Sequence, residues 1–113
     1  MVHGSDAEFC LVLVTVSSEA EATAIAQTVV QEKLAACVNL IPVRSVYIWQ
    51  DQLQQEPEWQ LLIKTTRDRC SALQERILAL HSYEVPEILA IPIQAGSPSY
   101  LAWIETQVNE TRE

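Results

Sequence analysis

The stretch VNLIPVRSVYIWQDQLQQEPEWQLLIKTT, residues 38–66, decides the fold because it reads as two strands joined by a turn. Residues 38–49 are rich in branched and aromatic side chains, which favour a strand. Pro42 lacks a backbone N–H and therefore marks a bulge or an edge position. Residues 50–57 are polar and acidic and are predicted to form the hairpin turn. The return strand, residues 58–66, alternates between two faces, with Trp59, Leu61 and Ile63 on one and Gln60, Leu62 and Lys64 on the other.

The sequence on either side of this hairpin supplies one strand and one helix before it, and one helix and one strand after it. Ser17 and Ser18 offer a cap for the first helix, Asp68 for the second, and Ser97 for a last helix. The order is β-α-β-β-α-β, which predicts an α+β protein, a ferredoxin-like split βαβ sandwich with an extra C-terminal helix. The predicted segments are a strand at 9–16, a helix at 19–34, strands at 38–49 and 58–66, a helix at 68–80, a strand at 87–93 and a helix from 97.

Two helices cover one face of a four-stranded sheet, so the second face needs another partner. The first two predicted strands are apolar on both faces, and the last helix is too short to hide this whole surface. Large exposed apolar patches usually mark interfaces. We therefore expect the chain to assemble with copies of itself, with residues 43–63 as the arm that reaches a neighbour. The candidate interface residues are Val43, Tyr47, Trp49, Trp59 and Leu62.

Length and composition restrict the class of protein. A chain of 113 residues fits one domain, assigned to residues 9–113, with residues 1–8 as a flexible N-terminal tail. The net charge of -8, from 15 acidic and 7 basic residues, disfavours nucleic acid as a partner and concentrates cations near the surface. No apolar run reaches the roughly 20 residues of a membrane span, and no signal-peptide pattern is found. We therefore expect a cytoplasmic protein without a membrane partner.

Cysteine and glycine usage exclude several kinds of site. Cys10, Cys37 and Cys70 form no C-x-x-C spacing, so the sequence predicts neither a disulfide framework nor a structural zinc site. Each cysteine is expected to be a small buried apolar side chain, which fits a reducing compartment. With Gly4 and Gly96 as the two glycines, a glycine-rich phosphate loop is excluded.

The segment HSYEVPEI, residues 81–88, is the candidate functional site. It places a histidine, a phenol and two carboxylates around one proline, at the point where a helix is predicted to end. Neutral imidazole suits Cu, Zn and Ni, and carboxylates supply oxygen ligands. The alternative is that His81 only stabilises the helix C-terminus and Glu87 only solvates a strand end. The predicted metal ligands are His81, Glu84 and Glu87, with Tyr83, Lys64 and Asn39 as neighbours that orient them or contact a bound ligand.

Three separated motifs resemble the CutA family of divalent cation tolerance proteins. They are KLAACVNLIP at 33–42, LIKTT at 62–66 and HSYEVPEI at 81–88, and the similarity extends over roughly residues 9 to 108. The resemblance implies a ferredoxin-like fold, a tight trimer and a link to copper and other divalent metals. It thus implies a divalent metal, Cu(II) in particular, as a cofactor that is not obligatory.

The chain departs from the pattern of some bacterial members, which carry a cysteine in the first strand and paired histidines before the tyrosine. Val14 stands at the cysteine position, and Leu80 replaces the first histidine and leaves His81 alone. Cys10 lies on the same strand face as Val14 but about 13 Å away, too far to replace it. A closed copper site within one subunit is therefore not expected, and symmetry-related groups or water would have to complete it.

A separate copper site is possible at the N-terminus. His3 is the third residue, and a histidine there completes a square-planar Cu(II) or Ni(II) site with the amine and two backbone nitrogens. This chemistry occurs in a test tube whatever the biology, so a copper titration has to separate it from the rest of the chain.

Three functions are compatible with these patterns. The first is a non-catalytic trimer that binds divalent metal and contributes to the response to metal ions. The second is a regulatory trimer similar to the PII signalling proteins, with a small metabolite bound in clefts between subunits. The third is an enzyme with His81 as general base. The sequence shows no nucleophile paired with an activating residue that would support it. Stabilisation by metal favours the first, stabilisation by a metabolite the second, and turnover the third.

Overall fold

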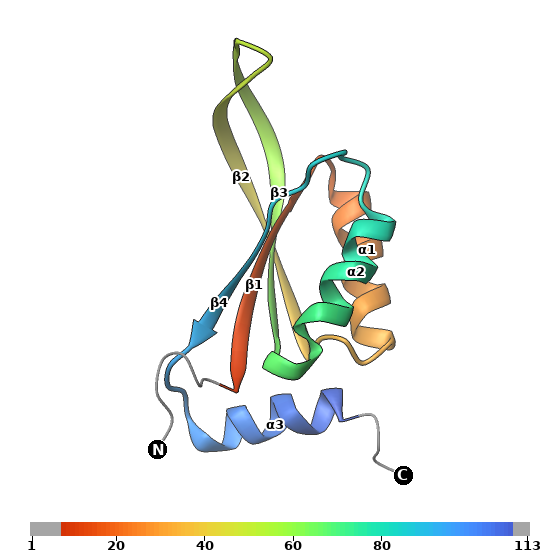
Figure 1. Ribbon diagram of the computed structural model, residues 1–113, viewed down its shortest axis with the longest axis vertical. Helices are drawn as coiled ribbons and strands as arrows, with labels where there is room; N and C mark the ends of the chain where they lie inside the picture. Colours follow the sequence, from red (N-terminus) through yellow and green to blue (C-terminus); the bar gives the residue numbers. More distant parts are fainter. Residues whose placement is uncertain (1–7, 110–113) are drawn as a thin grey trace.

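A computed structural model describes residues 8–109 and confirms the predicted order of elements (Figure 1). The predicted flexible tail at residues 1–7, including His3, lies outside these residues. Glu8, which was placed in the tail, accepts a hydrogen bond on its carbonyl from the Arg67 N–H at 2.7 Å. Within residues 8–109, no helix is long and apolar enough to cross a bilayer. The elements are β1 (Phe9–Val16), α1 (Glu19–Gln31), β2 (Cys37–Trp49), β3 (Gln52–Thr66), the short 3-10 helix η2 (Arg67–Arg69), α2 (Cys70–Leu80), β4 (Ile88–Ile93) and α3 (Pro98–Val108).

The four strands form one antiparallel sheet in the order β2-β3-β1-β4. Helices α1 and α2 cover one face of it, and α3 lies across the end of the sheet (Figure 1). The main core lies between this sheet face and the two helices. Its fully buried side chains include Val14, Val16, Ile25, Val29, Leu61, Ile63, Leu73 and Ile77. A second, smaller core beneath α3 contains Ala36, Ile104 and Val108.

Local capping explains where two of the three α-helices in residues 8–109 begin. The Ser18 side chain accepts from the Glu21 N–H at the start of α1, and the Ser97 side chain accepts from the Tyr100 N–H at the start of α3. The prediction that Asp68 caps α2 is wrong. Asp68 lies in η2, where its carboxylate accepts from the Thr66 hydroxyl at 2.6 Å, and α2 begins directly after that turn without a side-chain cap.

The hairpin of β2 and β3 forms an arm that extends beyond the rest of the sheet (Figure 1). The predicted turn at residues 50–57 is wrong, because the pairing continues to Trp49 opposite Gln52. The turn is Gln50 and Asp51, with φ of 53° and 64°, the left-handed pair that a tight two-residue hairpin uses. Pro42 occupies the predicted edge position, since β2 is an outer strand.

The second face of the sheet is apolar and largely without cover, as the sequence predicted. Alternation along the strands puts Leu13 of β1 on this face, with Leu62 of β3 and Leu89 of β4 in register beside it. We call this surface the open face. Among its apolar side chains, Ile41, Leu89, Ile91, Tyr47 and Trp49 are exposed in the single chain, and Leu11, Leu13, Val43 and Leu62 are half-buried. Trp59, the other predicted interface residue, instead packs against the main core on the helix-covered face.

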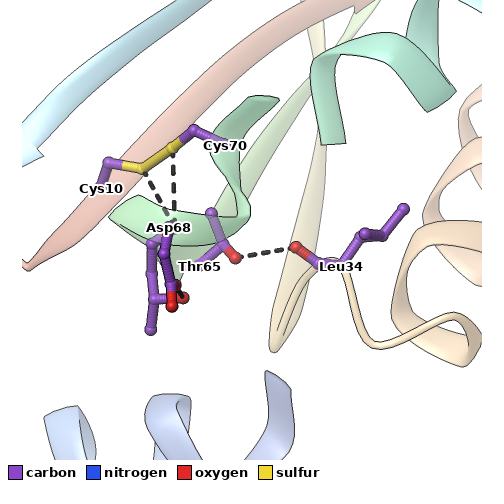
Figure 2. The surroundings of a disulfide bond; sticks show 6 residues. Cys10, Leu34, Thr65, Asp68 and Cys70 are labelled. Carbon is purple, nitrogen blue, oxygen red and sulfur yellow. Dashed lines mark hydrogen bonds between the residues drawn. A yellow bond between two sulfur atoms is a disulfide. The ribbon is translucent and has the colours of Figure 1, made fainter. Parts of the chain in front are cut away.

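Two of the three cysteines form a disulfide, which corrects the expectation that all three are unpaired (Figure 2). Cys10 of β1 is joined to Cys70 at the start of α2, with a Cα–Cα distance of 7.8 Å, wider than the usual spacing of about 4.4–6.8 Å. Cys37 is a free, half-buried thiol.

Candidate functional site

His81 is the C-cap of α2, and its side chain holds the following loop against β1. The imidazole is 0% exposed. Its Nε2 lies 2.7 Å from the Thr15 carbonyl, and its Nδ1 accepts from the Tyr83 N–H at 3.0 Å. A carbonyl cannot donate, so these contacts assign a neutral ring with the proton on Nε2. Both ring nitrogens are thus engaged, and neither has a free lone pair for a metal.

Glu21 of α1 anchors the same loop, a contact that the sequence pattern did not predict. Its Oε2 accepts from the Ser82 N–H at 2.9 Å, and its Oε1 accepts from the Ser82 hydroxyl at 3.0 Å. Oε2 also lies 3.7 Å from His81 Nδ1. Burial alone would raise the pKa of the Glu21 carboxyl, but the hydrogen bonds that it accepts from Ser82 outweigh burial and lower the pKa.

Glu21→Gln is expected to destabilise the protein by roughly 1 kcal/mol at neutral pH, because the charged acceptor of two hydrogen bonds is lost. Since folding lowers the pKa of Glu21, its stabilising effect is complete above the ordinary glutamate pKa of about 4.3 and disappears as the pH falls through the folded value. Urea unfolding of variant and parent at several pH values measures the difference. Glu19→Gln, in the same helical turn, is the control; a Glu21→Gln difference that stays constant below pH 4 would contradict this account.

Beside this loop, along the arm, lies a groove of about 660 Å³. Its walls come from β1, from the paired strands of the arm and from the loop before β4. The lining residues are Thr15, Ser45, Val46, Tyr47, Trp49, Glu56, Glu58, Tyr83, Glu84, Val85 and Glu87. We call this site the acidic groove, because four of these side chains are carboxylates and none is basic.

Two tyrosines hold two of the carboxylates in place. The Tyr47 hydroxyl donates to Glu56 at 2.9 Å, and the Tyr83 hydroxyl donates to Glu58 Oε2. Glu58 is only 6% exposed. Burial, together with the hydrogen bond to Glu58 and its charge, raises the pKa of Tyr83 well above the ordinary tyrosine value, and the hydrogen bond to Glu56 raises that of Tyr47. Both phenols therefore remain protonated donors at neutral pH.

The predicted metal ligands do not form a metal site within one chain. Glu84 and Glu87 line the acidic groove, where Glu87 accepts from the Gln60 amide at 3.4 Å, but the nitrogens of His81 are bonded elsewhere. Over residues 8–109, no group of three or more His, Cys, Asp or Glu side chains is arranged to hold a metal ion.

Lys64 and Asn39 form a separate group on the open face. The Lys64 ammonium donates to Asn39 and lies 3.9 Å from the Cys37 sulfur. Lys64 is four residues along β3 from Gln60, about 13 Å at the usual rise, and therefore lies away from Glu87, which contacts Gln60. Tyr100 of α3 adjoins this group, and burial, followed by the proximity of Cys37, raises its pKa.

Comparison with known proteins decides the family. The family described as "CutA1 divalent ion tolerance protein" matches residues 10–107. The chain belongs to this family. Similar full-length proteins include the divalent-cation tolerance protein CutA of Thermus thermophilus, which is 48% identical over 95 residues that cover 83% of this chain and 92% of the relative.

Further CutA proteins share the sequence and the fold. The chloroplastic protein CutA of Arabidopsis thaliana is 44% identical over 90% of this chain, and the chain spans 55% of that relative's length. A solved structure of CutA from Synechococcus elongatus superposes with a TM-score of 0.89 at 39% identity, over 91% of this chain and 92% of the other.

In this CutA chain, the positions that depart from the pattern of some bacterial members lie in the core. Val14 is fully buried on the helix-covered face, and Leu80 packs against the same core. Cys10 lies on that face too, as predicted, and is bonded to Cys70. None of the three is directed at the acidic groove.

Proposed function

We propose that this chain works as a non-catalytic homotrimeric divalent cation tolerance protein that binds divalent metal, copper in particular. Membership of the CutA1 divalent ion tolerance family carries the proposal. The net charge of -8 and the acidic groove favour cations over anions. Assembly is supported by the open face, and the number of three copies comes from the family resemblance.

The ligands available in one chain do not make a closed metal site. Copper prefers nitrogen and sulfur ligands, and the described part of the chain offers the acidic groove only oxygen atoms from carboxylates, hydroxyls and backbone. The proposal is therefore weak binding by groove carboxylates, with water or a neighbouring copy supplying the other ligands. His81 positions the loop that carries Glu84 and Glu87.

A titration of protein lacking residues 1–7 with Cu(II), Zn(II) and Mn(II) tests this proposal by calorimetry. The deletion removes the square-planar site that His3 offers. Saturable binding is expected, weakened about tenfold or more in a Glu84→Gln/Glu87→Gln double variant, since affinity follows the number of charged ligands. His81→Asn is expected to leave binding unchanged in protein that is still folded by circular dichroism.

Two results of this titration would contradict the proposal. Loss of binding in folded His81→Asn protein would make the histidine a ligand after all. Absence of saturable binding by any of the three metals would remove direct metal binding and favour the second candidate function.

The second candidate is a regulatory trimer that binds a small metabolite, and the acidic groove is the observation that favours it. Its volume of about 660 Å³ lies within the range of about 300–1,000 Å³ typical of small-molecule sites. Aromatic side chains with a few fixed polar groups are the usual lining of such sites. Thermal stabilisation by a small molecule in the presence of a chelator, without stabilisation by metal, would distinguish this function from the first.

A further inference from the structure

We propose that the Cys10–Cys70 disulfide is a reversible redox-sensitive crosslink, which fixes helix α3 while it is intact and loosens α3 when a small-molecule thiol reduces it. The inference goes beyond the proposed function and requires neither a metal nor a metabolite. It follows from the accessibility of the two cysteines, from one carbonyl that both sulfurs face, and from the hydrogen bonds of the short helix η2 next to Cys70.

The two sulfur atoms differ in accessibility. Cys10 of β1 is buried in the main core, whereas Cys70 is half-buried and begins α2 beside the exposed Ser71. Both cysteines lie on the helix-covered side of the sheet, so copies that cover the open face do not cover Cys70. Thiol–disulfide exchange depends on access to the sulfur that is attacked. The attack by a thiolate therefore falls on Cys70.

The exchange needs only a small-molecule thiol such as glutathione. Its thiolate bonds to the Cys70 sulfur, the protein S–S bond breaks, and the Cys10 sulfur leaves with the electron pair and takes up a proton. A second thiolate attacks the glutathione sulfur of the mixed disulfide, and Cys70 leaves and is protonated in turn. Two small thiols are thus oxidised to one disulfide as the protein disulfide is reduced to two thiols. An excess of the small disulfide reverses both steps.

The reduced cysteines have a hydrogen-bond acceptor already in place. The Thr66 carbonyl oxygen lies 3.9 Å from the Cys10 sulfur and 3.7 Å from the Cys70 sulfur (Figure 2). A thiol is a weak donor, and a carbonyl oxygen has two lone pairs, so this one oxygen can accept from both thiols. A reduced cysteine also packs as a small apolar side chain. Both redox states therefore fit the same fold.

The helix η2, which Cys70 follows directly, connects the start of β1 to the end of α3. The Arg67 N–H donates to the Glu8 carbonyl at 2.7 Å. The Arg69 guanidinium donates to the Val108 carbonyl through Nε at 3.0 Å and through Nη2 at 2.8 Å. Val108 is the last residue of α3, where helix carbonyls have no partner within the helix. By fixing Cys70, the disulfide fixes its neighbour Arg69, which holds α3 across the end of the sheet (Figure 1).

Hydrogen exchange of the assembled protein in glutathione buffers of different redox ratio tests the inference, with mass spectrometry to follow the Cys10–Cys70 bond. The bond is expected in excess oxidised glutathione, and both thiols are expected in excess reduced glutathione, in protein that is still folded by circular dichroism. The amides of α3 are expected to exchange about tenfold faster in the reduced protein, because this end of the sheet opens locally more often. The amides of α1 are expected to exchange at the same rate in both states.

Arg69→Gln tests whether the crosslink acts through this side chain. It removes hydrogen bonds from a charged donor to Val108, and exchange in α3 is expected to rise about tenfold in the oxidised protein. Most of the response to reduction is expected to disappear. Arg76→Gln is the matched control, an equal loss of charge on α2, where the guanidinium binds Glu32 instead. It is expected to respond to reduction like the parent.

Four results would overturn the proposal. They are absence of the bond in excess oxidised glutathione, a bond that opens only when the protein unfolds, opening without faster exchange in α3, and an undiminished response in Arg69→Gln. The parent protein alone decides the first three, so a variant that fails to fold does not prevent the test. None of these results depends on metal or metabolite binding.

Discussion

Replacing Leu89 with glutamate is expected to break the assembled protein into single chains while leaving each chain folded. Leu89 lies on the open face and is 55% exposed in the single chain. On a monomer, a charge at such a position changes stability by about 0.5 kcal/mol or less. In a trimer that buries this face, every copy would bring one unpaired carboxylate into an apolar interface, at a cost of several kcal/mol in all. Light scattering coupled to size-exclusion chromatography measures the mass.

Leu78→Glu is the matched control for this experiment. Leu78 lies on α2, on the other side of the sheet from the open face, and is 48% exposed. The same substitution there is expected to leave the mass of the assembly unchanged. Dissociation by both variants, or by neither, would show that the open face is not the interface.

Leu73→Ala is expected to lower the free energy of unfolding by about 2–5 kcal/mol, the cost of a cavity in a core that cannot fully collapse. Leu73 of α2 is 0% exposed and belongs to the main core between the helices and the sheet. Chemical denaturation at fixed protein concentration measures the change, because assembly makes the apparent stability concentration-dependent.

Leu78→Ala is the control for this experiment. It is the same substitution in the same helix, with the same change in helix propensity as Leu73→Ala, but it removes an exposed side chain. Its expected cost is below about 1 kcal/mol. Equal losses for Leu73→Ala and Leu78→Ala would place the core of the protein elsewhere than between α2 and the sheet.

The order of helices and strands was predictable because local patterns encode it. Alternation identifies β3, helical spacing identifies α1, and the serines at 18 and 97 cap the helices where predicted. The open face was predictable because two helices can cover only one of the two faces of a four-stranded sheet. The length of the arm was not predictable, because its polar residues pair as strands and no glycine signals the turn at Gln50 and Asp51.

The interactions within the site were less predictable because they join distant segments. The sequence indicated the loop at 81–88, and the structure places Tyr83, Glu84 and Glu87 beside one groove. Nothing local shows that Glu58 is buried, since it follows an exposed arm and is covered by a tyrosine 25 residues away. The occupied nitrogens of His81 depend on β1, which is 66 residues away. The Cys10–Cys70 bond, 60 residues apart, was likewise invisible to the spacing of the cysteines.

We expect two further copies of the chain to cover its open face and its arm. Sedimentation equilibrium of the unmodified protein over a range of concentrations measures the mass of the assembly. A single species of three times the mass of one chain is expected down to low micromolar concentration. A species with the mass of one chain over that range would contradict it, because the open face would then be exposed in the working protein.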